Sequence, residues 1–135
     1  MARTYVITGS ASGIGAETTR LLRERGEKVI GIDLKDAEVE ADLSTPEGRT
    51  DAANKAIELA DGGIDAVIAC AGISAPISKT VSINFFGVTE LLEHLLPVLA
   101  KSEAPRAAVV SSIASLQPNS KAVSYTHLRA HETLR

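Results

Sequence analysis

The chain has 135 residues, of which 44% are apolar, as expected for a globular domain with a hydrophobic core. The formal net charge of −3 argues against nucleic acid as a partner. No apolar run reaches the roughly 20 residues that a membrane-spanning helix needs, and the N-terminus has no signal-peptide pattern. We therefore expect a cytoplasmic protein with no membrane partner. The single cysteine, Cys70, excludes an intrachain disulfide.

A glycine-rich turn separates the first two expected elements. The apolar run Thr4–Thr8 is typical of a buried parallel strand, and Ala16–Arg25 has the pattern of a helix that ends at Gly26. The turn between them, from Thr8 to Gly15, reads TGSASGIG. A strand, a glycine turn and a helix in this order place a pyrophosphate at a helix N-terminus.

Each glycine of the turn has its own expected task. Gly9 allows the tight turn, Gly13 lets the backbone approach a phosphate, and Gly15 lets the helix pack closely on the strand. Ser10 and Ser12 can add hydroxyl donors. An ordinary glycine-rich turn in an α/β protein is the alternative interpretation.

The second expected strand, Lys28–Ile32, ends in an acidic residue, Asp33. Asp33 lies 18 residues after Gly15, about where dinucleotide-binding folds place the acid that binds the adenosine ribose. A carboxylate there accepts both ribose hydroxyls and repels a 2′-phosphate, so we predict NAD rather than NADP. The alternative is a solvated turn aspartate.

Two further strands and one helix follow. Glu38–Ala41 can form a short strand, and a helix capped by Ser44 or Thr45 runs to about Ala60. Its apolar stripe comprises Ala53, Ala56, Ile57 and Ala60. The fourth strand is Asp65–Ala69, followed by the small residues Cys70, Ala71 and Gly72, which would let the backbone lie against a cofactor. Cys70 itself is expected to be a small buried hydrophobe rather than a nucleophile.

The longest helix pattern covers Ser78–Leu99 and is apolar over more than one face. We therefore expect it to contact both the sheet and a partner subunit. His94 on this helix is expected to pack or to be solvated rather than to take part in catalysis. A fifth strand over Arg106–Ser111 leads to Ser112.

Alternating strands and helices predict an α/β fold with a doubly wound parallel sheet. Ligands bind beyond the carboxyl ends of such strands. Gly9, Asp33, Cys70 and Ser112 all fall at strand ends, on that one edge, which indicates a nucleotide site. The sequence shows no cluster of metal ligands, and we predict no metal site.

Six segments together resemble the classical type of short-chain dehydrogenase/reductase. They are TGSASGIG, Asp33, Asp42-Leu43, CAG at 70–72, INFFG at 83–87 and VVSSIAS at 109–115. The resemblance covers Thr4 to about Ser115. CAG departs from the family's usual NNAG, since Cys70 stands where asparagine is common. The segments GIDLKDAEVEADLSTPEGR and INFFGVTELLEHLLPVL are most similar to the branch of bacterial 3α-hydroxysteroid dehydrogenase/carbonyl reductases.

This resemblance implies a Rossmann-type fold, of which the chain would supply the N-terminal half to two-thirds, with about five strands. It also implies a role for each matching residue. Residues implied to hold the cofactor are Gly9, Ser10, Gly13, Ile14, Gly15, Asp33, Asp42, Leu43, Cys70, Ala71 and Gly72. Asn84 would anchor a proton-relay water, and Ser112 would hydrogen-bond the substrate carbonyl as charge develops on its oxygen.

The tyrosine and lysine that complete the family's site are not matched convincingly. Tyr125 lies 13 residues after Ser112, but Arg129 stands at the lysine position. The run Val123–Thr133, VSYTHLRAHET, matches one reading frame of the transposon-end adapter used in sequencing libraries. We therefore interpret 1–122 as a truncated NAD-binding domain and 123–135 as an adapter-derived tail, which makes Tyr125 a doubtful catalytic residue.

The resemblance implies an NAD-dependent oxidoreductase that transfers hydride between nicotinamide and an alcohol or ketone, such as a hydroxysteroid or another carbonyl compound. The intact parent would be a homodimer or homotetramer, and the 135-residue chain itself would be inactive. A non-catalytic NAD-binding module is the alternative. An epimerase or dehydratase of the same family is disfavoured by the glycine spacing.

Overall fold

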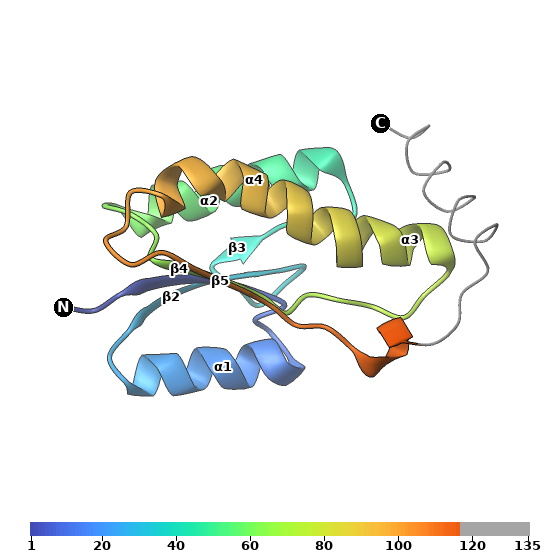
Figure 1. Cartoon of the computed structure of the whole chain (residues 1–135), viewed down its shortest axis with the longest axis horizontal. Coiled ribbons are helices and arrows are strands. Elements are labelled where there is room, and N and C mark those ends of the chain that lie inside the picture. Colours follow the sequence, from blue (N-terminus) through green and yellow to red (C-terminus); the bar gives the residue numbers. More distant parts are fainter. Residues whose placement is uncertain (117–135) are drawn as a thin grey trace.

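Five strands form one sheet in the order β3-β2-β1-β4-β5, and every neighbouring pair is parallel (Figure 1). The strands are β1 (Thr4–Thr8), β2 (Lys28–Asp33), β3 (Val39–Glu40), β4 (Ala66–Ala69) and β5 (Arg106–Val109). The computed structural model describes residues 1–116, so the predicted boundary between 1–122 and 123–135 lies outside them. The predicted α/β fold with a parallel sheet is confirmed.

Helices cover both faces of the sheet (Figure 1). The helix α1 (Gly13–Glu24) lies on one face, while α2 (Pro46–Ala60) and α4 (Gly87–Leu99) lie on the other. The main hydrophobic core fills the space beneath α2 and α4, where Leu91 and Leu95 pack at 1% and 0% exposure. In Figure 1 the carboxyl ends of the strands lie at the right of the view, beside α3 (Ile77–Val81).

The helix α1 begins three residues earlier than predicted, at Gly13 rather than Ala16. The helix turns Gly15 and Thr19 to the buried side and leaves Ile14 and Leu21 exposed. The cause is the close packing of Gly15, where an added Cβ would lie 2.1 Å from the carbonyl oxygen of Gly9. This contact turns the Gly15 side of the helix inward.

The helix α2 begins as predicted and ends just before Asp61. The hydroxyl of Thr45, and not that of Ser44, caps it by accepting a hydrogen bond from the Gly48 amide at 3.0 Å, with Pro46 in the first turn. The predicted apolar stripe packs into the hydrophobic core, with Ala53, Ala56 and Ala60 buried and Ile57 partly buried. One unexpected residue shares that stripe: Arg49 is fully buried.

The predicted single helix over Ser78–Leu99 is wrong in one respect. A π-helical turn, η1 (Ser82–Phe86), separates α3 from α4, so the segment is three consecutive pieces. One face of α4 is buried, whereas Leu96 and, in η1, Phe85 are more than half exposed. Among the described residues, no helix is long and apolar enough to cross a membrane.

Candidate functional site

The glycine turn after β1 leaves room for backbone only. Gly9 adopts a φ of +68°, and its amide donates to the carbonyl of Ile32 at 2.8 Å. A Cβ added to Gly9 would lie 2.9 Å from the Cα of Ala71. An L residue would therefore be strained by its backbone conformation and would also collide with the segment after β4.

The N-terminus of α1 opens directly from this turn. Its N-cap residue, Ser12, has an extended backbone but makes no side-chain capping bond. The first turn of the helix also carries no acidic side chain. First-turn amides without a side-chain cap, at the positive end of a helix dipole, suit an anionic group such as a pyrophosphate.

The side chain of Asp33 ties the end of β2 to the glycine turn. One carboxylate oxygen accepts from the Ala11 amide at 3.0 Å, and the other accepts from the Leu34 amide at 2.7 Å. Each oxygen keeps a lone pair for a further donor. The carboxylate is thus held beside the turn at the carboxyl end of β2.

Ser10 lies beneath the turn, with its hydroxyl directed at β2. A Cβ on Gly31 would lie 2.3 Å from the Ser10 hydroxyl oxygen and 2.8 Å from a carboxylate oxygen of Glu38. That same Glu38 oxygen accepts from the Gly31 amide at 2.8 Å. Burial raises the pKa of Glu38, but the Gly31 amide and the Arg23 guanidinium outweigh it and bring the pKa below its ordinary value.

Thr8 connects β1 to the small-residue segment after β4, and sequence reasoning did not identify it. Its hydroxyl oxygen accepts from the amides of Cys70 and Ala71 at 3.1 and 3.0 Å. Thr8 is 1% exposed, so these amides are satisfied inside the protein. The signal available in the sequence was a polar residue ending an otherwise apolar strand.

The segment that follows is fixed by Asn84 of η1. The Asn84 side chain accepts from the Ile73 amide and donates to the Ile73 carbonyl, both at 2.9 Å. This pair of bonds attaches the chain after Gly72 to the π-helical turn. An amide side chain can make up to four hydrogen bonds, so Asn84 retains one donor and one acceptor site.

A pocket of about 470 Å³ opens where the ends of β4 and β5 meet η1. It brings together five residues that the sequence placed in the site: Cys70, Ala71, Gly72, Asn84 and Ser112. The Cys70 side chain is half-buried rather than buried as expected, and desolvation raises the pKa of its thiol. Ser112 lies exposed on the β5 side of this pocket.

The segment Asp42–Leu43 lies after β3. The Ser44 hydroxyl and backbone amide hold the pKa of Asp42 below its ordinary value, with a bond of 2.9 Å from that amide. Leu43 is 6% exposed, and its carbonyl accepts from the Arg49 guanidinium at 2.9 Å. Arg49 on α2 therefore contacts the site from the side of the core. The sequence gives one sign of its burial, which is its helical spacing from Ala52, Ala53 and Ala56.

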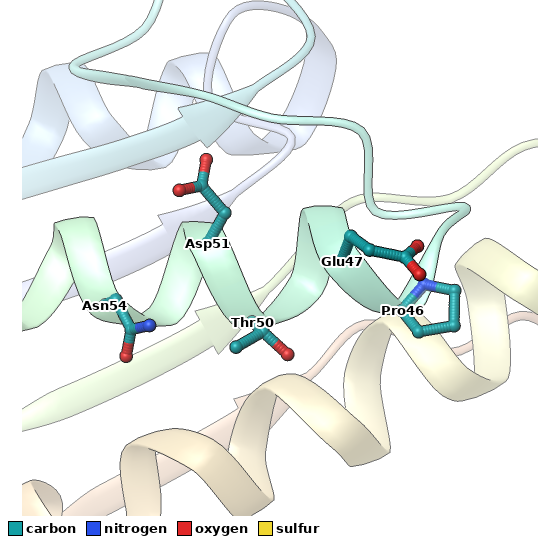
Figure 2. A pocket seen from close by; sticks show the side chains of 5 residues that line it. All are labelled: Pro46, Glu47, Thr50, Asp51 and Asn54. Carbon is teal, nitrogen blue, oxygen red and sulfur yellow. The ribbon is translucent and has the colours of Figure 1, made fainter.

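A second hollow, of about 450 Å³, lies on α2 (Figure 2). All five residues that line it belong to that helix, and their side chains diverge rather than converge (Figure 2). Two of them are the carboxylates Glu47 and Asp51, which would repel a phosphate. The pocket at the strand ends is therefore the better candidate for an anionic ligand.

The structure thus joins most of the predicted residues along one edge of the sheet. Asp33 contacts the glycine turn, Gly9 contacts Ala71, and Asn84 shares a pocket with Ser112. Tyr125 lies outside the described residues. Among residues 1–116, no cluster of His, Cys, Asp and Glu could hold a metal ion.

Residues 3–127 match the family model for short chain dehydrogenases. The chain is 45% identical over 113 residues to a 3-alpha-hydroxysteroid dehydrogenase/carbonyl reductase of Comamonas testosteroni. This match covers 82% of this chain and 44% of that protein. It is 41% identical over 99 residues to a coniferyl-alcohol dehydrogenase of Pseudomonas sp. (strain HR199 / DSM 7063), covering 67% of this chain and 37% of the relative.

A solved structure is also similar. It is the 3-alpha-hydroxysteroid dehydrogenase from Pseudomonas sp. B-0831 complexed with NADH, with a TM-score of 0.85 and 40% identity. The match covers 96% of this chain and 57% of that one. The chain thus spans about half the length of the relatives it matches. These matches agree with the predicted resemblance to the hydroxysteroid dehydrogenase branch.

Proposed function

Since the chain belongs to the short-chain dehydrogenase/reductase family, we propose that it binds NAD(H) across the carboxyl ends of β2, β1 and β4. The whole protein would be an oxidoreductase that moves hydride between nicotinamide and an alcohol or ketone. When bound, NAD supplies the ring that accepts or donates the hydride. The residues of this chain bind and orient the reactants around it.

The observation that supports cofactor binding most strongly is the glycine turn with its uncapped helix. The sheet order changes direction between β1 and β4, which is the switch point where open α/β sheets bind nucleotides. At that point Gly9 and Ala71 approach each other through backbone, and the first turn of α1 lacks a side-chain cap. A pyrophosphate fits there, with Ser10, Gly13, Ile14 and Gly15 forming the rest of the turn.

The Asp33 carboxylate supports a preference for NAD over NADP. It is held by the Ala11 and Leu34 amides, and its free lone pairs suit two ribose hydroxyls. The 2′-phosphate of NADP would bring a second negative group against it. Asp42 and Leu43 would flank the adenine beyond the ribose.

The pocket at the ends of β4 and β5 supports the assignment of the reacting end of the site. The small residues Cys70, Ala71 and Gly72 would pass behind the nicotinamide-side ribose. The Ser112 hydroxyl would donate to a substrate carbonyl oxygen as negative charge develops on it. Asn84 would hold a relay water with the donor and acceptor that its bonds to Ile73 leave over.

For the substrate we propose an alcohol/ketone pair carried on a larger carbon skeleton, such as a hydroxysteroid, because relatives named for such compounds match the chain. For assembly we propose a homodimer or homotetramer, since Phe85 and Leu96 present exposed apolar side chains on one helical segment. A cytoplasmic location stays a prediction.

Titration of the chain with NADH and NADPH, followed by calorimetry, tests the cofactor proposal. We expect saturable NADH binding and at least about tenfold weaker NADPH binding, a difference of about 1.4 kcal/mol. Asp33→Asn should bring the two affinities together. Asp36→Asn is the matched control, since it removes an equal charge from the next loop at a positive φ that asparagine tolerates. Equal affinities in the unaltered chain, or a folded chain without NADH binding, would contradict the proposal.

A further inference from the structure

Arg49 is a fully buried cation that joins two segments of the site. Its Nε donates to the Glu90 carboxylate at 2.6 Å. One terminal nitrogen, Nη1, donates to the carbonyls of Leu43 at 2.9 Å and Ser82 at 3.3 Å. Arg49 is 0% exposed, so contacts within the protein have to offset the desolvation of its charge.

The contacts of Arg49 hold both ends of the π-helical turn. Ser82 is the first residue of η1, and Phe86, whose ring centroid lies 6.0 Å from the guanidinium carbon, is the last. Asn84 lies between them and carries the two bonds to Ile73. A shift of η1 would therefore move the Asn84 side chain and release the chain after Gly72.

Arg49 also fixes the other side of the site. The Leu43 carbonyl that it binds lies 3.5 Å from the position of a Cβ on Gly87, the first residue of α4. The segment Asp42–Leu43 and the start of α4 are thus in contact, with the guanidinium beside both. Its planar fork reaches acceptors in three segments at once, which the single ammonium of a lysine cannot match.

We propose that Arg49, paired with Glu90, is a positioning residue that sets the place of η1 and Asn84 relative to the segment Asp42–Leu43. The effect of Arg49 on cofactor and substrate binding rests on the proposed function, whereas its contacts with η1 and Leu43 do not. Within the described residues, the second terminal nitrogen, Nη2, has no hydrogen-bond partner, so the arginine is not held there by a fully satisfied network.

Amide hydrogen exchange of the full chain tests the proposal, with the Ile73 rate divided by that of Val67 as the measured quantity. The Ile73 amide is bonded to Asn84, whereas Val67 is buried in β4 and reports opening of the whole sheet. Asn84→Ala sets the upper limit of the ratio. We expect Arg49→Met and Arg49→Lys to raise the ratio about tenfold, towards that limit.

The control is Arg20→Met, which removes an arginine from exposed ion pairs with Glu17 and Glu24 on α1. It should leave the ratio within about twofold of the unaltered chain. If Arg49→Met does not fold, the double variant Arg49→Met/Glu90→Leu replaces the buried pair by apolar groups. A ratio within about twofold of the unaltered chain in the folded Arg49 variants would overturn the proposal.

NADH titration of the same variants separates this proposal from the proposed function. We expect Arg49→Lys to weaken NADH binding about tenfold while Arg20→Met leaves it unchanged. If the unaltered chain does not bind NADH, the proposed function fails, and the exchange ratio still decides whether Arg49 positions Asn84. If NADH binds but the ratio does not respond to Arg49, only the positioning proposal fails.

Discussion

A Cβ on Gly9 would lie 2.9 Å from the Cα of Ala71, closer than real Cβ atoms approach a backbone. Gly9 follows β1 and Ala71 follows β4, so the main chains of the two segments are in direct contact here. The same glycine has a φ of +68°, which L residues rarely adopt. Conformation and contact both require glycine at this position.

We predict that Gly9→Ala lowers the free energy of unfolding by about 2–4 kcal/mol, from the positive φ and the collision together. Gly26→Ala is the matched control. Gly26 has a φ of +82°, but no atom lies within 4 Å of its added Cβ. It should lose only about 1 kcal/mol. Denaturant unfolding measures both values, and equal losses in the two variants would show that the Ala71 contact carries no cost.

Thr8 gives a second prediction, because its hydroxyl accepts hydrogen bonds from two part-buried amides. Thr8→Val keeps the volume of the side chain but leaves the Ala71 amide without the acceptor 3.0 Å away. We expect a loss of about 1–3 kcal/mol in the free energy of unfolding and faster exchange of the Ala71 amide. Thr8→Ser retains the hydroxyl, so the exchange of Ala71 should stay slow even though a buried methyl is lost. Fast exchange in the serine variant would mean that the methyl, not the hydroxyl, orders this segment.

The sequence predicted the strands and their ends well because local signals mark them. The run Thr4–Thr8 is apolar and is followed by glycine, so its predicted bounds equal those of β1. Thr45, Pro46 and Asp61 likewise delimit α2 by capping and turn chemistry. These signals lie within a few residues of the feature they set.

Features that depend on distant contacts were missed. The apolar spacing continues through 82–86, so periodicity gives no sign of the π-helical turn there. That turn presents Asn84 to Ile73, eleven residues earlier in the chain. The burial of Arg49 depends on Glu90, which follows it by 41 residues. Arginine is usually exposed, so composition alone favours the wrong environment for it.

The carboxylate of Asp65 predicts a pH dependence of stability. It accepts from the Ser102 hydroxyl at 2.6 Å and from the Thr4 amide at 2.8 Å, and these bonds hold its pKa below the ordinary value. A carboxyl whose pKa is lowered by folding stabilises the folded state above its unfolded pKa of about 3.9. That contribution is lost as the pH falls below this value and through the lower pKa of the folded state.

We therefore expect Asp65→Asn to reduce the free energy of unfolding at pH 7 and to flatten its decline as the pH falls below about 4. Denaturant unfolding at a series of pH values measures the slope. Asp51→Asn is the charge-matched control, since Asp51 forms an exposed pair with Lys55 on α2. An unchanged slope in Asp65→Asn would show that the bonds from Ser102 and Thr4 do not distinguish the charged from the neutral carboxyl.

Cys70 allows the site to be probed without substitution, because it is the only cysteine in the chain. Burial raises the pKa of its thiol, so little of the reactive thiolate is present at pH 7. We expect modification by a disulfide reagent to be at least about tenfold slower in the native chain than in guanidinium, and to accelerate as a rising pH converts the thiol to thiolate. Cys70 also lines the pocket that holds Asn84 and Ser112, so saturating NADH should slow the reaction further, whereas an equal concentration of NADPH should protect less. A native rate equal to the denatured rate would contradict partial protection of the thiol by the fold. Slow modification that NADH leaves unchanged would instead place the cofactor elsewhere than behind the segment 70–72.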